Sequence, residues 1–225
     1  MNTSYFLIII IGLIGLIVQM KLKSVFKKYS HEYFPGGHTG KEVAQKMLHD
    51  HGIYDVQVVA TRGVLTDHYN PTTRTVNLSE SVYSSCSISA AAVAAHECGH
   101  AVQHAQGYAP LRLRSALVPV IQFSSIFSTW VVIAGIFLIN TVPAIFWVGI
   151  AMIAASALFS IVTLPVEYNA SRRALTWLEN THILSPEQMK GATISLRWAA
   201  RTYLVAAISA IATLLYYLGY APDKD

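Results

Sequence analysis

Residues 115–166 form a run of 52 residues that contains no Asp, Glu, Lys, Arg or His. A helix that crosses a bilayer needs about 20 apolar residues, so this run is about twice as long as one crossing requires. Asn140 and Pro143, in the stretch "INTVPA", supply turn-forming residues inside the run. The sequence therefore predicts a hairpin of two membrane-spanning helices that turns at this stretch.

Two further apolar runs lie near the ends of the chain. Residues 1–20 carry no charge and include "YFLIIIIGLIGLIV", and residues 202–222 are also uncharged. Lysines follow the first run, whereas a cleaved signal peptide would begin with positive charge, so we expect a retained anchor. Charged residues make up only 12% of the chain, about half the fraction of a soluble domain. We predict a polytopic α-helical membrane protein with about four transmembrane helices.

Basic residues flank one end of each predicted span. They are Lys21, Lys23, Lys27 and Lys28 after the first span, Arg112 and Arg114 before the second, Arg172 and Arg173 after the third, and Arg197 and Arg201 before the fourth. Because positive flanks favour the cytoplasm, we expect the N-terminus outside and 15 of the 16 basic residues inside the cell. The protein would be a multi-pass plasma-membrane protein. Its net charge of +4 then follows from topology and does not indicate nucleic-acid binding.

The predicted spans divide the chain into five segments. They are an N-terminal anchor with its basic flank at 1–28, a cytoplasmic domain at 29–114, the transmembrane hairpin at 115–166, a cytoplasmic helical segment at 167–200, and a C-terminal transmembrane helix with its tail at 201–225. The expected fold class is α+β, with a small cytoplasmic domain attached to a bundle of membrane helices.

Within residues 29–114, helix and strand signals alternate. "TGKEVAQKMLHDHG" predicts a helix, with Thr39 and Glu42 at capping-box spacing and Gly52 at its end. "YDVQVVA", "GVLTDHY" and "RTVNLS" predict short strands, and "NPTT" joins the last two as a hairpin. An alanine-rich helix follows, which we expect to be capped within "SSCSIS" and ended by Gly107.

The alanine-rich helix contains "HECGH", in which His96 and His100 are four residues apart and Glu97 stands between them. Four residues make about one helical turn, so both imidazoles project from one face and can hold one Zn²⁺ ion. Glu97 lies beside that face and is suited to take a proton from a water that the metal activates. This is the H-E-x-x-H arrangement of zinc peptidases. The pattern also arises by chance in roughly one chain in a hundred of this length, so incidental histidines are the alternative.

A catalytic zinc site needs a third protein ligand. His104 continues the four-residue spacing but drifts away from the metal along the helix. Cys98 points to the opposite side, where we expect a small buried residue. The metzincin pattern requires Gly and His where this chain has Gln103 and Gln106, which excludes that class. The third ligand must come from another segment.

Glu167, in "LPVEYNASRRALTWLEN", is the best candidate for the third ligand. The two crossings of the predicted hairpin return the chain to the side from which it left, which is the side of the histidines. The helical composition after Glu167 places it in the first turn of a helix near the membrane. The alternative is a carboxylate that caps the N-terminus of that helix.

The motif, the hairpin and "VEYNASRRAL" together resemble the YugP-type membrane zinc metallopeptidases, with a more distant similarity to HtpX and the CAAX prenyl-protein endopeptidases. "LTDHYNP", "LSESVY" and "GYAPLRLRSALVPV" fit the same pattern, so the resemblance covers about residues 35–180. It implies a zincin-like domain of the gluzincin type, with one zinc ion held by His96, His100 and Glu167 and with Glu97 as catalytic base.

The chain departs from the more distant group at one position. That group has an acidic residue four positions after the glutamate ligand, where this chain has Ser171 and therefore no carboxylate to support a zinc-bound histidine. Asn169, Arg172 and Arg173 are alternatives for that support. Residues close enough in sequence to stabilise an oxyanion, each with a structural role as the alternative, are Tyr168, His104, Arg172 and Arg173.

We therefore expect a membrane zinc endopeptidase that cleaves membrane or membrane-associated proteins, with Glu97 passing a proton from water to the leaving amine. An intramembrane site-2 protease is disfavoured, because the nine residues from His96 to His104 contain five titratable side chains, Cys98 included. The alternative outside enzymes is a non-catalytic membrane scaffold or transporter subunit with incidental histidines. Against it, the predicted spans hold no charged residue to mark an ion or substrate path.

The remaining polar residues have predicted structural or surface roles. The strand "GVLTDHY" either closes the small sheet or offers an edge to which an extended substrate adds. Cys86 and Cys98 should be free thiols on the reducing side of the membrane. Side chains expected to be solvated are His49, His51, Asp67 and His68.

Overall fold

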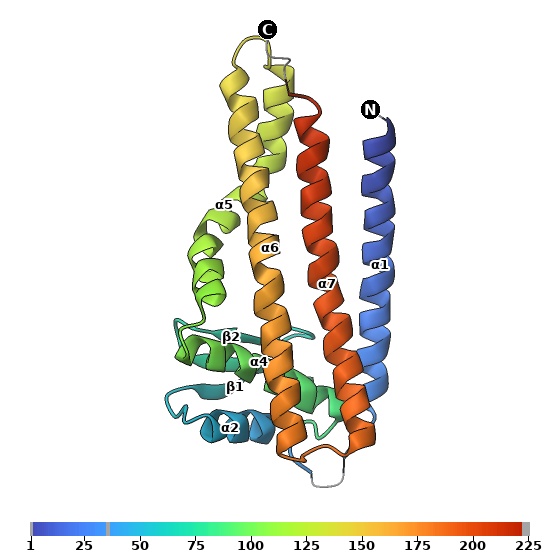
Figure 1. The fold of residues 1–225 in the computed structure, drawn as a ribbon, viewed down its shortest axis with the longest axis vertical. Coiled ribbons are helices and arrows are strands. Elements are labelled where there is room, and N and C mark those ends of the chain that lie inside the picture. The colour runs from blue at the N-terminus through green and yellow to red at the C-terminus, as the bar shows by residue number, and fades with distance from the viewer. Residues whose placement is uncertain (1, 35–36, 222–225) are drawn as a thin grey trace. The chain divides into compact units, whose positions relative to one another are not determined.

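The computed structural model describes residues 2–34 and 37–221 and is mostly helical (Figure 1). Its elements in chain order are α1 (Asn2–Ser30), α2 (Gly40–Asp50), β1 (Gln57–Thr61), β2 (His68–Asn70), β3 (Thr75–Ser79), α3 (Glu80–Tyr83), α4 (Ile88–Ala105), α5 (Ala109–Phe137), α6 (Pro143–Asn180) and α7 (Pro186–Leu218). They form two compact units. The first contains the described residues of 1–17, 112–165 and 202–225, and the second contains 18–111 and 166–201.

The first unit consists of apolar helix segments. Four helices, α1 from Phe6 onward, α5, α6 and α7, are long and apolar enough to cross a membrane, by length and composition. Their number agrees with the prediction, and the predicted hairpin is present because α5 and α6 are joined by a turn at residues 138–142. Phe123, Ile126 and Trp130 are 63%, 65% and 71% exposed, as expected for helices that face lipid.

Glycines allow α5 and α6 to approach closely within the first unit. A Cβ atom added to Gly135 would lie 2.4 Å from Cα of Phe146, and one added to Gly149 would lie 2.4 Å from Cγ2 of Val132. Small residues at such positions let membrane helices pack with their backbones close together. The two helices are therefore held together by close packing next to their turn as well as by the turn itself.

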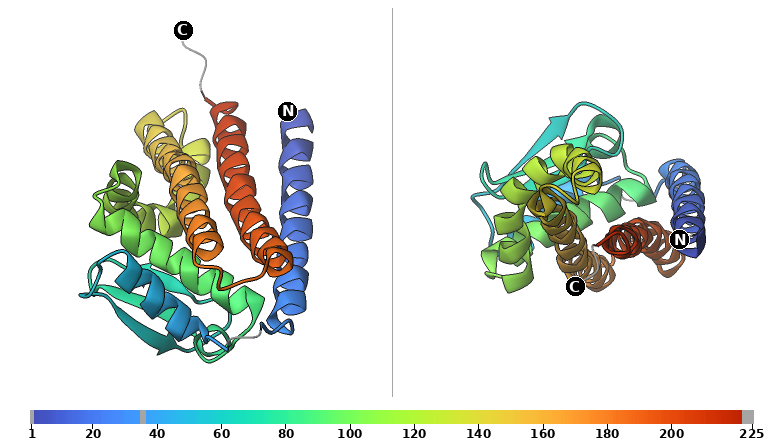
Figure 2. Two further views of the ribbon diagram at one scale, coloured as in Figure 1. Left: turned by 60° about the horizontal axis from the view of Figure 1, so that its bottom comes forward. Right: turned by 90° about the horizontal axis from the view of Figure 1, so that it is seen from above.

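The second unit packs α2, α4 and a three-stranded sheet around one apolar core. The strand order is β1-β3-β2, and β3 pairs parallel with β1 and antiparallel with β2. Helix α4 packs against α2 and against β2 and β3 (Figures 1 and 2). The core includes the fully buried side chains of Val43, Met47, Leu78 and Leu178. The strands β1 and β2 are the two edges of the sheet.

Several local signals in the second unit are confirmed. Thr39 caps α2 and forms the predicted capping box with Glu42. Ser87, within "SSCSIS", caps α4 with its side chain. Gly107 follows the end of α4 with φ +64°, a conformation that glycine adopts without strain. These signals worked because each depends on a few neighbouring residues only.

The predicted strand "GVLTDHY" is wrong over most of its length, because only His68–Asn70 is a strand. Gly63 and Leu65 have φ angles of 107° and 58°, which an extended strand does not accommodate. The carboxylate of Asp67 accepts hydrogen bonds from the backbone N–H of Ser79 at 2.7 Å and from its hydroxyl at 3.0 Å. The prediction that Asp67 is only a solvated side chain is therefore wrong. Its carboxylate ties this loop to the end of β3.

The predicted position of Glu167 in the first turn of a helix is also wrong. Helix α6 begins at Pro143 and continues to Asn180, so Glu167 lies well inside it. Pro165 stands within the same helix, where it removes one backbone donor without ending the helix. The alternative of a capping carboxylate at a helix N-terminus is therefore excluded for Glu167.

Candidate metal centre

Helix α4 carries the H-E-x-x-H motif and is buried along most of its length. Its N-terminal half is a run of small residues, with alanine at five of the six positions 90–95. A Cβ added to Gly99 would lie 2.6 Å from the backbone oxygen of Ala170 in the second-unit part of α6. This close approach brings Glu167 to the face of α4 that carries the histidines.

The side chains of His96, His100 and Glu167 converge. Oε2 of Glu167 lies 3.3 Å from Nε2 of His96 and 3.6 Å from Nε2 of His100. One ligand atom from each residue lies within 4.8 Å of the others, which makes the three a group that could hold a metal ion. Ligand atoms around a tetrahedral zinc ion are about 3.4 Å apart when the bonds are about 2.1 Å long. Both the donor types and their spacing therefore fit zinc.

Both histidine rings turn Nε2 toward Glu167 and Nδ1 toward a neutral partner. Nδ1 of His96 lies 3.1 Å from Oγ of Ser171, and Nδ1 of His100 lies 3.0 Å from Oε1 of Gln103. Ser171 thus contacts a histidine from the position where the more distant group has an acidic residue. Gln103 had no predicted role at the site, although its place three residues after His100 on one helix was a usable signal.

Glu97 is 8% exposed and lies next to the His–His–Glu group without belonging to it. Burial raises the pKa of its carboxyl to about 7, and the nearby charges of Glu167 and Asp67 act in the same direction. His96 and the backbone N–H of Tyr69, in the edge strand β2, act in the opposite direction. A carboxyl held in this way can exchange a proton near neutral pH.

The chain matches, over residues 4–221, the family described as "Putative neutral zinc metallopeptidase". It belongs to that family. A curated relative, "Putative membrane protease YugP" from Bacillus subtilis (strain 168), is 40% identical over 217 residues, which cover 95% of each chain. No solved structure matches the chain. The predicted resemblance is confirmed, and the four apolar helices agree with a membrane protease of this family.

Other residues singled out from the sequence lie outside the His–His–Glu group. Nδ1 of His104 lies 2.7 Å from the hydroxyl of Tyr69, so this histidine is tied to β2. Among the oxyanion candidates, Tyr168 is 47% exposed, and Arg173 donates one hydrogen bond to the side chain of Asn169. None of these side chains is in the group that could hold a metal among the described residues.

The remaining sequence expectations concern the two cysteines and two histidines, one in α2 and one at its C-terminal end. Cys86 and Cys98 are free, as predicted, and the buried thiol of Cys98 donates to the backbone oxygen of Ala44. His49 and His51 are exposed, in agreement with the prediction of solvated side chains.

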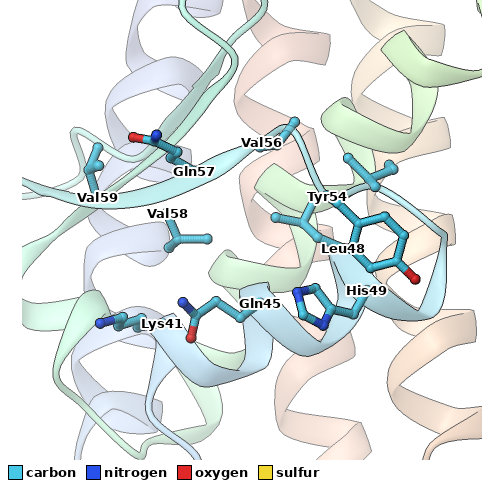
Figure 3. Close-up of a pocket in the computed structure, with 10 residues that line it drawn as sticks. Lys41, Gln45, Leu48, His49, Tyr54, Val56, Gln57, Val58 and Val59 are labelled. Atoms are coloured by element: carbon cyan, nitrogen blue, oxygen red, sulfur yellow. The ribbon is translucent and has the colours of Figure 1, made fainter.

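Two surface cavities of the second unit are lined by residues outside the group. One of about 350 Å³ lies between α2 and β1 and is lined by Lys41, Gln45 and His49 of α2 and by Val58 of β1 (Figure 3). Another, of about 400 Å³, is lined in part by Arg172 and Arg173. Neither includes a residue of the His–His–Glu group.

Proposed function

We propose that this protein is a membrane-embedded zinc endopeptidase of the gluzincin type that cleaves membrane or membrane-associated proteins. The observation that carries the proposal is the convergence of Nε2 of His96 and Nε2 of His100 on one carboxylate oxygen of Glu167. The three residues come from two segments more than 60 positions apart, and a chance arrangement of two helical histidines would not bring a buried carboxylate to both rings.

One zinc ion per chain would be held by His96, His100 and Glu167. When bound, zinc lowers the pKa of a water and polarises the carbonyl of the scissile peptide bond. The fit rests on the donor set: two imidazole nitrogens and one carboxylate oxygen, as in catalytic zinc sites that keep a fourth position open.

Glu97 would act as the catalytic base. Its carboxylate takes a proton from the attacking water and delivers it to the nitrogen of the leaving amine, so one group serves as base and then as acid. Two features support this role: Glu97 neighbours the ligand His96 in sequence, and it lies outside the ligand group.

The edge strand β2 would bind the substrate. It lies at the margin of the sheet, and the backbone N–H of its Tyr69 is beside the carboxylate of Glu97. An extended peptide that adds to a free sheet edge is held by backbone hydrogen bonds. A substrate held along β2 would therefore pass next to the proposed base.

The site would face the cytoplasm of a multi-pass plasma-membrane protein. Support comes from the basic residues that flank each apolar helix on one side, which favour the cytoplasmic face. With the N-terminus outside, the segment of residues 29–114 and Glu167 fall on that same side.

The proposal is tested with the full-length protein in detergent or vesicles. Elemental analysis should find about one zinc per wild-type chain, and an unfolded reporter protein such as labelled casein should be cleaved in a chelator-sensitive way. His96→Ala should show neither zinc nor cleavage. Zinc without cleavage of any tested substrate would favour the scaffold alternative, and a wild-type chain without zinc would contradict the metal site.

A further inference from the structure

His100 must offer an unprotonated Nε2 to bind zinc, so its neutral imidazole must carry the proton on Nδ1. The partner of Nδ1 decides which tautomer is present. Here that partner is Oε1 of Gln103, at 3.0 Å. An amide oxygen can only accept a hydrogen bond, so this contact requires a proton on Nδ1 of His100.

The orientation of the Gln103 amide is fixed from its other end. Its Nε2 donates to the backbone oxygen of Val166 at 2.8 Å and to Oδ1 of Asn169 at 3.0 Å. The carbonyl of Val166 cannot donate, and Gln103 is 0% exposed. If the amide were flipped, Oε1 of Gln103 would face the backbone oxygen of Val166 with no proton between the two atoms, which is costly for buried groups. The oxygen of Gln103 must therefore face His100.

Arg173 fixes the Asn169 amide in the same way. Its Nε donates to Oδ1 of Asn169 at 2.7 Å, and its Nη1 donates to Oε1 of Gln106 at 2.7 Å. A guanidinium has no acceptor, so Asn169 must turn its oxygen toward Arg173. The same oxygen then accepts from Gln103. Arg173, Asn169, Gln103 and His100 thus form a chain of hydrogen bonds, and each bond in the chain has only one possible direction.

His96, the other histidine of the motif, has no such constraint at its Nδ1. Nδ1 of His96 lies 3.1 Å from the hydroxyl of Ser171. A hydroxyl can rotate to donate or to accept, so this contact is compatible with either tautomer of His96. The two histidines therefore differ at Nδ1: the partner of His100 requires a proton there, and the partner of His96 does not.

We propose that Gln103 is a positioning residue that holds His100 in the tautomer with a proton on Nδ1 before zinc binds. The inference rests on the proposed zinc site and deepens it: one histidine is preset for the metal and the other adjusts. Glu167 lies between Val166 and Asn169 in α6. One helical stretch therefore supplies a proposed ligand together with the groups that orient another.

Nitrogen-15 NMR of the zinc-free, full-length protein with labelled histidine rings tests the tautomer directly. At pH 8.5, the wild type should show His100 with its proton on Nδ1, facing Oε1 of Gln103. His100→Gln assigns the signals. Gln103→Met, which keeps the length of the side chain and removes the acceptor, should produce a mixture of tautomers. A wild-type His100 with its proton on Nε2, or unchanged His100 signals in Gln103→Met, would overturn the proposal.

Ser195→Ala is the matched control for loss of a buried polar group. Ser195 is 0% exposed, and its hydroxyl has no hydrogen-bond partner among the described residues. The control should leave the His100 signals unchanged. A change there as large as in Gln103→Met would mean that the tautomer responds to general packing, and it would contradict the specific role of Gln103.

Release of zinc to a chelator gives a second readout that does not depend on catalysis. Gln103→Met should release zinc about 10- to 100-fold faster than the wild type. Asn169→Asp keeps an acceptor for both Arg173 and Gln103 and should behave as the wild type does. If Gln103→Met does not fold, Asn169→Leu replaces it, because Asn169 is only half-buried. An unchanged His100 tautomer and an unchanged rate of zinc release in Asn169→Leu would then overturn the proposal.

His96→Ala separates failure of this inference from failure of the proposed function. If His96→Ala loses zinc while Gln103→Met keeps the wild-type tautomer and release rate, only the positioning role is wrong. If His96→Ala holds zinc as tightly as the wild type does, the zinc site itself is wrong.

Discussion

Gly99 of α4 approaches Ala170 of α6 so closely that a Cβ added to Gly99 would lie 2.6 Å from the carbonyl oxygen of Ala170. Gly99 precedes His100, and Ala170 follows Glu167 by three residues. The contact therefore sets the distance between two segments that carry proposed ligands. Backbone atoms, and not a flexible side chain, oppose any larger residue at position 99.

Gly99→Ala should lower both zinc content and thermal stability, because the added methyl group must push α4 and α6 apart at a cost of about 1–3 kcal/mol. Elemental analysis after dialysis against a mild chelator and thermal unfolding measure the two effects. Gly12→Ala is the matched control, since a Cβ at Gly12 meets nothing within 4 Å. Wild-type zinc content in Gly99→Ala would show that the close approach is not needed for binding.

Glu167→Ala should lose zinc and activity while it still inserts into the membrane. The expected loss of affinity is at least the 10- to 100-fold that is typical when a supporting residue of a metal site is removed. Glu167→Asp should be intermediate, because the carboxylate survives but is one methylene shorter. Glu179→Ala, on an exposed position of the same helix, is the control. If Glu167→Ala keeps its zinc while His96→Ala loses it, the third ligand lies elsewhere.

Glu97→Gln should abolish hydrolysis and leave about one zinc per chain, because the amide cannot take a proton from water. Activity and elemental analysis on the same preparation check both parts. Cleavage at the wild-type rate would rule out Glu97 as the base. Loss of zinc would instead make Glu97 a ligand.

The long apolar helices and the three residues of the candidate metal site were predictable because their signals do not depend on how helices cross. Uncharged runs of sufficient length give the spans, and a spacing of four residues puts His96 and His100 on one helical face. The reasoning that reached Glu167 used the return of the hairpin to its starting side and the helical composition that follows, and the family resemblance implied the same residue. Capping at Thr39 and Ser87 was predictable for a similar reason, since it involves neighbours within three residues.

The features that were missed depend on tertiary context. Pro165 marks a break by local rules, yet α6 continues through it, because proline is tolerated inside such helices. Gln103 and Asn169 meet only because α4 and α6 pack closely at Gly99, and no spacing in the sequence encodes that crossing. The start of β2 was misplaced because Asp67, just before it, binds Ser79 in place of a strand ladder.

The zinc-free protein should lose stability as the pH rises from about 4.5 to about 7. The pKa of Glu97 is raised by burial from 4.5 to about 7, so in this range the folded chain binds more protons than the unfolded chain. The loss is at most about 3 kcal/mol. Glu97→Gln removes the carboxyl, so the zinc-free variant should gain melting temperature relative to the zinc-free wild type at pH 8 and less at pH 5. An equal difference at both pH values would contradict the buried, proton-retaining state of Glu97.

The predicted orientation puts the N-terminus outside and both residues 29–114 and Glu167 inside the cell. Positive flanks carry this prediction, and the flanks of all four predicted spans agree. Fusions of a reporter that is active only in the cytoplasm should be active after residue 70 and after residue 180, and silent at the C-terminus. Moving the two lysines Lys27 and Lys28 to the N-terminal side of the first span should weaken that pattern, whereas replacing them with arginines should preserve it. A reporter that is silent after residue 70 but active after residue 180 would put the histidines and Glu167 on opposite sides of the membrane, and no metal site could then form between them.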